Sequence, residues 1–173
     1  MAKFHILVPL DDSSFSRTIL PSIVRMFNAQ HTTVTLFRVG NIPEGVAPSS
    51  RTAVVASDGS LYSPEYFEAP PVYSSQVWDS TLNELVDSME ADMRYLKEAG
   101  FEVNRIAHFG DAADEIIDHV GSKAVDLVVM CTHGRSGLRR ALMGSVAEKV
   151  LRQVSIPVML LRPDEQPETR ISN

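Results

Sequence analysis

The segment 126–130, Asp-Leu-Val-Val-Met, has four consecutive apolar residues after its first position. A strand with one face in water alternates apolar and polar residues, whereas a parallel strand covered by helices on both faces is apolar throughout. Similar apolar runs occur at 4–9 and 158–161. The segment 33–39 is rich in β-branched and aromatic residues, and 101–109 alternates apolar with polar positions. These five segments are predicted strands.

Four amphipathic segments separate the strands, and each predicts one helix. They are the stretch marked by Phe15, Ile19, Ile23 and Phe27, a long segment from Leu82 to Leu96, the stretch after Asp111, and 145–154. Asp111 is a natural N-cap, and Gly100 ends the long segment. Strands that alternate with helices predict right-handed crossovers. The expected fold class is therefore α/β, a five-stranded mostly parallel sheet with helices on both faces.

The chain of 173 residues shows no internal repeat and fits a single domain, 1–173. From residue 40 to about 75 the periodicity is lost, because five prolines and many Ser and Gly residues interrupt it. So long a stretch is either a surface excursion or a functional loop. We favour a mobile Pro/Ser-rich insertion, since no cluster of polar chemistry lies within it. The acidic end, about 164–173, predicts a flexible tail.

The net charge of −6 gives no indication of binding to nucleic acid or to an anionic membrane. Cys131 is the single cysteine, so a disulfide within the chain is impossible, which is typical of a reducing compartment. No apolar run approaches the roughly 20 residues of a membrane helix, and the first residues lack the zones of a signal peptide. We therefore expect a cytoplasmic protein.

The residues that follow 126–130 predict a phosphate site. A glycine-bearing loop leaves the strand and enters a helix near Ser145, where unpaired N–H groups and the helix dipole favour an anion. Glycine lets the backbone approach a ligand closely, and three arginines could neutralise a polyphosphate. These residues are Gly134, Gly137 and Gly144, with Arg135, Arg139 and Arg140.

A purely structural interpretation of this loop stays open. Ser145 and Glu148 fit a capping box, so Ser145 could simply cap its helix, with the glycines as turn residues and the arginines as a solvated face. The spacing matches neither a Walker A loop nor a Rossmann dinucleotide fingerprint. In a doubly wound sheet, ligands bind at the carboxyl ends of strands where strand order reverses. That rule points to Asp11, Val39 and the residues from Met130 onwards.

We do not identify a catalytic constellation. Cys131 and His133 lie two residues apart at a strand end, but no third group that would orient them can be named. A cysteine without visible activation is more often a small buried apolar residue. The five histidines show no recurrent zinc-ligand spacing, so no metal site is expected. At most the chain would be a slow ATPase, because the loop supplies no obvious base to orient water.

Three segments resemble the universal stress protein family: ILVPLDDS at 6–13, GDAADEII at 110–117, and THGRSGLRRALMGSVAEKVLRQVSIPVMLLRP at 132–163. The resemblance covers most of the chain apart from the insertion near 40–75. Its nucleotide-binding branch carries a glycine, two residues, a second glycine, nine residues, and then Gly-Ser or Gly-Thr. Gly134 matches the second glycine and Gly144-Ser145 ends the motif, while Cys131 replaces the first glycine.

The resemblance implies a Rossmann-like fold of the adenine nucleotide alpha hydrolase type and a site for ATP, with Mg2+ as a potential companion. AMP and cyclic AMP are alternative ligands. Asp11 would contact the adenine edge, although an N-cap role shared with Asp12 and Ser13 is the alternative. The implied cofactor-binding residues are Pro9, Leu10, Asp11, Val39, Met130, Cys131, His133, Gly134, Arg135, Gly137, Gly144, Ser145 and Val146.

The family resemblance also implies how the protein would act. Nucleotide occupancy and dimerisation would regulate a response to stress, with the homodimer formed through the edge strand Val158–Leu161. The alternative is a dimeric interaction protein of the same fold that binds no nucleotide. The Gly144-Ser145 pair favours the first function, and Cys131 favours the second.

Overall fold

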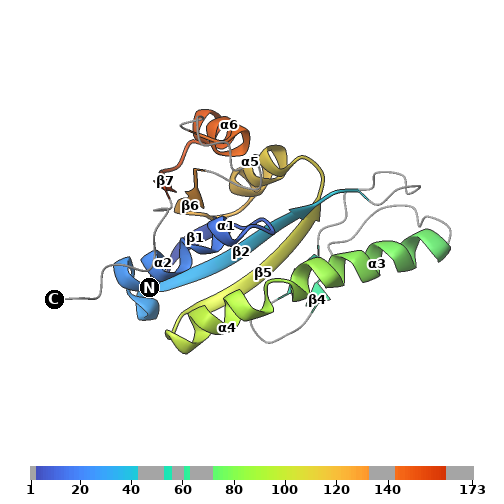
Figure 1. Ribbon diagram of the computed structural model, residues 1–173, viewed down its shortest axis with the longest axis horizontal. Helices are drawn as coiled ribbons and strands as arrows, with labels where there is room; N and C mark the ends of the chain where they lie inside the picture. Colours follow the sequence, from blue (N-terminus) through green and yellow to red (C-terminus); the bar gives the residue numbers. More distant parts are fainter. Residues whose placement is uncertain (1–2, 43–52, 56–60, 63–71, 133–142, 163–173) are drawn as a thin grey trace.

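The computed structural model describes residues 3–42, 53–55, 61–62, 72–132 and 143–162. Over this part of the chain the strands form one sheet in the order β4-β3-β5-β2-β1-β6-β7 (Figure 1). The strands are β1 (Phe4–Pro9), β2 (Thr32–Gly40), β3 (Ala53–Val55), β4 (Leu61–Tyr62), β5 (Glu102–Phe109), β6 (Leu127–Cys131) and β7 (Val158–Leu161). The helices are α1 (Ser14–Arg17), α2 (Leu20–Met26), the 3-10 turn η1 (Ala29–His31), α3 (Val72–Asp87), α4 (Glu90–Glu98), α5 (Ala112–Ser122) and α6 (Ser145–Gln153).

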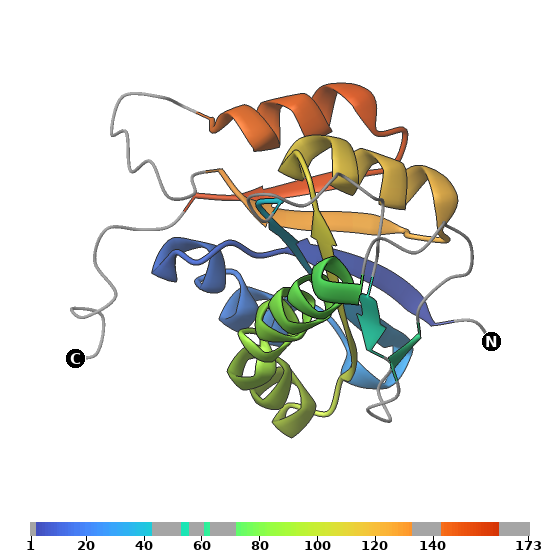
Figure 2. The same ribbon diagram turned by 90° about the vertical axis from the view of Figure 1, so that its right-hand side faces the viewer.

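The five strands expected from the sequence are confirmed as β1, β2, β5, β6 and β7, and neighbours among them pair in parallel. Helices cover both faces: α5 and α6 lie on one side, and α1 to α4 on the other (Figure 2). From β1 the chain builds outwards to β2 and β5, and then returns to the opposite edge of β1 to add β6 and β7. Strand order therefore reverses between β1 and β6.

Burial on both faces explains the unbroken apolar runs. In β1, Ile6 and Val8 belong to the core beneath α2 and α4, whereas Leu7 belongs to the core beneath α5 and α6. All three side chains have 0% exposure. In β6, Val128 and Val129 divide between the two cores in the same way. Each fully buried aliphatic side chain contributes about 1.5–3 kcal/mol relative to exposure.

The insertion expected at 40–75 contains strands that the sequence did not predict. Strand β3 pairs antiparallel with β5, and β4 pairs antiparallel with β3. Strands of three and two residues are too short to show a period of two, and the open edge of β5 is what selects them. Most of the insertion and the tail at about 164–173 lie outside the described residues.

The single helix predicted around Ile19 is wrong, because two short helices take its place. Pro21 has no N–H, and its ring would collide with the carbonyl of Arg17 in a continuous helix. The chain therefore turns at Thr18, whose hydroxyl donates to the Phe15 carbonyl at 2.6 Å, and α2 restarts with proline in its first turn.

The long helix predicted from Leu82 to Leu96 is also two helices. It begins earlier, at Val72, and breaks at Ser88 and Met89 between α3 and α4. The break lies where Arg105 of β5 donates to the Val86 carbonyl at 3.2 Å. A side chain that enters the helical hydrogen-bond ladder is a known cause of a kink. Gly100, with φ of +92°, follows the end of α4 as expected.

His119 of α5 makes folding sensitive to acid. Its ring is buried, and it lies 5.0 Å from the Phe37 ring and 6.1 Å from the His108 ring. Burial, together with the nearby charges of His108, His5 and Lys123, lowers the pKa of His119 to about 4 from its ordinary 6.5. Between pH 6.5 and 4, His119 is therefore protonated in the unfolded chain and neutral in the native chain. The stability from this site is complete above pH 6.5 and is lost as the pH falls towards 4.

We expect His119→Phe to remove this dependence. Between pH 7 and 4.5 the wild type should lose on the order of 2 kcal/mol more unfolding free energy than the variant. Urea unfolding at several pH values measures the difference. The exposed His31 is the matched control, and His31→Phe should track the wild type. Parallel pH curves for wild type and His119→Phe would contradict the assignment.

Candidate functional site

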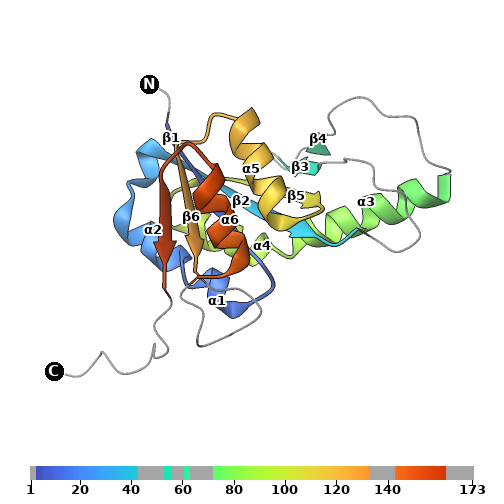
Figure 3. The same cartoon turned by 90° about the horizontal axis from the view of Figure 1, so that it is seen from above.

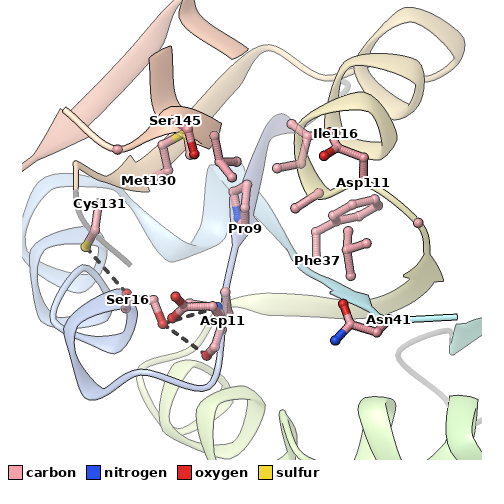
Figure 4. Close-up of a pocket in the computed structure, with 16 residues that line it drawn as sticks. Pro9, Asp11, Ser16, Phe37, Asn41, Asp111, Ile116, Met130, Cys131 and Ser145 are labelled. Carbon is pink, nitrogen blue, oxygen red and sulfur yellow. Dashed lines mark hydrogen bonds between the residues drawn. The ribbon is translucent and has the colours of Figure 1, made fainter. Parts of the chain in front are cut away.

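A pocket of about 440 Å3 opens where strand order reverses (Figure 4). Residues at the carboxyl ends of β1, β2 and β6 and at the N-terminal ends of α5 and α6 line it. Seen from above, α5 and α6 lie side by side over the sheet (Figure 3). Its lining residues are Pro9, Leu10, Asp11, Ser16, Phe37, Val39, Asn41, Gly110, Asp111, Ala112, Ile116, Met130, Cys131, Gly144, Ser145 and Val146. The volume lies within the range of small-molecule sites.

The structure brings together nine of the residues implied by the sequence: Pro9, Leu10, Asp11, Val39, Met130, Cys131, Gly144, Ser145 and Val146. The other four, His133, Gly134, Arg135 and Gly137, lie outside the described residues, as do Arg139 and Arg140.

The sequence did not predict the part of the pocket wall formed by the end of β5 and the start of α5. Gly110 directly follows β5 and begins the stretch GDAADEII at 110–117, so the rule that ligands bind at strand ends could have found it. Ser16, Phe37 and Asn41 carry no local sequence signal and line the pocket because of the tertiary arrangement.

Asp11 organises the turn after β1. Its Oδ1 accepts hydrogen bonds from the Ser13 amide at 3.0 Å and from the Ser13 hydroxyl at 2.5 Å. Ser13, rather than Asp11 or Asp12, is the N-cap of α1, because its hydroxyl accepts from the Ser16 amide. Asp12 instead forms an ion pair with Arg38 of β2. The N-cap alternative for Asp11 is therefore wrong, and Asp11 lies at the pocket wall.

The start of α6 also differs from the capping-box interpretation. Gly144 is the N-cap, Ser145 is the first helical residue, and no side chain caps the helix. The Glu148 amide donates to the Gly144 carbonyl at 2.9 Å, an ordinary first turn. Ser145 therefore does not cap α6. The Gly144 amide itself donates to the Thr132 carbonyl at 2.6 Å, so the amides left to face a ligand belong to the first helical turn.

Cys131 ends β6 as a buried thiol, as the sequence predicted. Its Sγ donates to the Phe15 carbonyl at 3.1 Å, which ties the strand end to α1. Burial raises the pKa of the thiol, with a further rise from the charge of Asp11, while the contact with Thr18 lowers it. Figure 4 shows the sulfur directed towards α1 rather than towards Ser145. The neutral, buried thiol lacks the features of a catalytic nucleophile.

The opposite wall is the start of α5. Asp111 is its N-cap, as expected, and Oδ1 accepts from the amides of Ala113 at 3.2 Å and Asp114 at 3.1 Å. The hydrogen bond from the Asp114 amide is the main reason that the pKa of Asp111 is lowered. Lys149 of α6 bridges Asp114 at 2.7 Å and Asp111 at 3.3 Å, and the Asp114 contact raises the pKa of Lys149. The two helices are thus joined beside the pocket.

Gly110 gives the chain its sharp exit from β5. Its φ of +143° is a conformation that residues with a side chain rarely adopt. A Cβ at this position would also lie 2.8 Å from Oε1 of Glu115. Glycine is therefore required for the backbone at this point of the wall.

The pocket combines apolar surface with two carboxylates, Asp11 and Asp111. Among the described lining residues there is no lysine, arginine or histidine. An anionic group would therefore meet the positive ends of the α5 and α6 dipoles first. A flat apolar ring suits the surface formed by Val39, Ile116 and Met130.

The described residues hold no group of three or more His, Cys, Asp or Glu side chains that could bind a metal ion. They also include no helix long and apolar enough to cross a membrane.

Comparison with known proteins finds a family model and relatives that agree on one family. The model of the universal stress protein family matches residues 4–162. The universal stress protein YxiE of Bacillus subtilis is 29% identical over 156 residues, which are 90% of this chain and 97% of that protein.

Solved structures share the fold. The structure of MJ0577 superposes with a TM-score of 0.69 at 21% identity, covering 96% of this chain and 100% of that one; MJ0577 is a universal stress protein of Methanocaldococcus jannaschii. An Arabidopsis thaliana family protein with AMP bound gives a TM-score of 0.59 at 15% identity, covering 94% and 93% of the two chains. A universal stress protein in complex with cAMP gives 0.52 at 18% identity, covering 95% and 100%.

The family match spans nearly all of the chain, the five expected strands pair in parallel within one sheet, and the segments that carried the resemblance converge on one pocket. The chain belongs to the universal stress protein family.

Proposed function

We propose that this chain binds an adenine nucleotide in the pocket between β1 and β6 and acts as a nucleotide-responsive regulatory protein in a response to stress. One observation carries the proposal. Nine residues implied by the sequence resemblance, from β1, the turn after it, β2, β6 and the start of α6, line one cavity of about 440 Å3 at the reversal of strand order. Two relatives of the same fold, solved with AMP and with cAMP, support an adenine ligand.

ATP is the ligand that we expect, with Mg2+ as a companion, and AMP and cyclic AMP are the alternatives. The base would lie against Val39 and near Asp11, and the phosphates would meet Ser145 and Val146 at the start of α6. The replacement of the first motif glycine by Cys131 does not argue against binding, since its sulfur is directed towards α1. We include His133, Gly134, Arg135 and Gly137 in the proposed nucleotide site because the family resemblance implies them.

Calorimetric titration with ATP and Mg2+, AMP and cyclic AMP tests the proposal, after any co-purified nucleotide has been removed. We expect micromolar binding of at least one of them. Gly144 has φ of −73° and ψ of 154°, which valine can adopt, so Gly144→Val should fold and fill part of the pocket. Its affinity should fall about tenfold or more.

Gly121 offers a matched control. It lies on the exposed side of α5, and a Cβ there would meet nothing within 4 Å. Gly121→Val should bind as the wild type does. If none of the three nucleotides binds the wild type, nucleotide binding is refuted, and the chain is better described as a dimeric interaction protein.

We also propose a homodimer through β7. This strand is the last of its sheet edge, its partner β6 lies on one side, and all four residues are half-buried. An edge that carries apolar residues is open to pairing with another chain.

Light scattering should give a mass of about twice 19.1 kDa. Met159→Lys, in β7, should return the mass to that of a single chain. Met26→Lys places the same change on exposed α2 and should leave the dimer intact. A wild-type mass of one chain at every concentration would exclude the dimer.

A further inference from the structure

Helix α1 and the Asp11 turn form one hydrogen-bonded unit at the pocket wall. Ser16 Oγ donates to the carbonyls of Asp11 at 3.2 Å and of Ser13 at 3.0 Å, and the Asp11 amide donates to Ser16 Oγ at 3.3 Å. Asp11 Oδ1 in turn holds Ser13. If α1 moves, the wall of the pocket therefore moves with it.

This unit cannot hold its own orientation. With only four residues, α1 is far shorter than a helix that is stable alone. Its position must come from contacts with other elements. One is the bond from Cys131 Sγ to the Phe15 carbonyl, and another is the ion pair between Asp12 and Arg38.

A third contact, which reaches α4, is made by Arg17. Its Nε lies 3.1 Å and 3.0 Å from the two carboxylate oxygens of Asp92 in α4, and its guanidinium also donates to the Ser13 carbonyl at 3.4 Å. A further contact reaches the Ser88 carbonyl at the break between α3 and α4, at 3.5 Å. One side chain thus joins the pocket turn to the helix pair that covers the sheet.

An ion pair with one buried partner is weak evidence of a stabilising role. The Asp92 side chain is only 7% exposed, and that of Arg17 is 33% exposed. Burial raises the pKa of Asp92, and the charge of Arg17 and its hydrogen bond offset this only in part. Buried ion pairs are often replaced by apolar residues without loss of stability, whereas removal of one partner of a buried carboxylate such as Asp92 is costly. Apolar contacts, unlike hydrogen bonds to a charged group, do not fix the orientation of α1.

We infer that Arg17 is a positioning residue for the pocket: by joining Asp92 of α4 to the Ser13 carbonyl, it fixes the orientation of α1 and of the Asp11 turn. Arg17 acts through Ser13 and does not touch the ligand. The inference rests on the proposed function in so far as the pocket holds a nucleotide. The attachment of α1 can also be measured without any ligand.

The test compares Arg17→Met with the double variant Arg17→Met/Asp92→Leu. The single variant leaves a buried carboxylate without its arginine and should lose stability. The double variant has an apolar pair of similar size and should regain the wild-type melting temperature. Nucleotide affinity should fall about tenfold in both, because both lack the charged hydrogen bonds that orient the turn.

Cys131 supplies the readout without ligand. Its thiol lies against the Phe15 carbonyl of α1 with 8% exposure, so a displaced α1 uncovers it. The rate of its reaction with a small aromatic disulfide should rise about tenfold in both variants at 25 °C. The exposed pair Lys3–Glu102 is the control, and Lys3→Met and Lys3→Met/Glu102→Leu should change neither rate nor affinity.

The outcomes separate the possible roles. Recovery of stability without recovery of affinity and thiol protection supports positioning by Arg17. If the double variant recovers stability, nucleotide affinity and thiol protection together, Arg17 has a structural role only, and this overturns the inference. If the wild type binds no nucleotide, the proposed function fails. The thiol rate of the double variant then decides alone: a rise supports the inference, and a wild-type rate overturns it.

Discussion

Strand β1 is paired with β2 on one edge and with β6 on the other, and it is buried on both faces. This placement determines where the chain can hold a ligand. Because the chain first builds outwards on one side of β1 and later adds β6 on the other side, strand order reverses there and a space is left at the carboxyl end of β1. The turn through Asp11 and the first turns of α5 and α6 face that space. The site is therefore a consequence of how the core is built.

The two faces of the sheet have different chemistry. The face under α5 and α6 is largely apolar, with the neutral ring of His119 packed against Phe37 behind the pocket wall. The face under α1 to α4 contains the buried charges Arg38, Arg105 and Asp92. Buried charges need partners, and those partners are the turn after β1, the break between α3 and α4, and Glu90. Directional contacts thus gather where the chain bends, at the turn after β1 and at the break between α3 and α4.

Sequence patterns failed where the apolar spacing or a capping pattern competed with another local signal or with a tertiary contact. The four-residue spacing of Phe15, Ile19 and Ile23 indicated one helix, but Pro21 and the Thr18 hydroxyl end it and start another. The apolar positions around Met89 fit a continuous helix, yet Arg105 reaches a carbonyl of that helix from β5, a strand later in the sequence. Likewise Ser145 fits a capping box, but the chain enters α6 one residue earlier, at Gly144.

The sequence by itself determined the five parallel strands and the helices that begin near Asp111 and Ser145, and its resemblance to a known family indicated the motif residues that meet at one pocket. It could do so because burial on both faces leaves a continuous apolar run, an N-cap such as Asp111 leaves a local polar signal, and an amphipathic stripe marks α6. Only the tertiary structure decided that β3 and β4 extend the sheet, that Ser16 and Phe37 line the pocket, and that Arg17 reaches Asp92. These features depend on contacts between residues far apart in the chain, and such contacts leave no periodic or local signal.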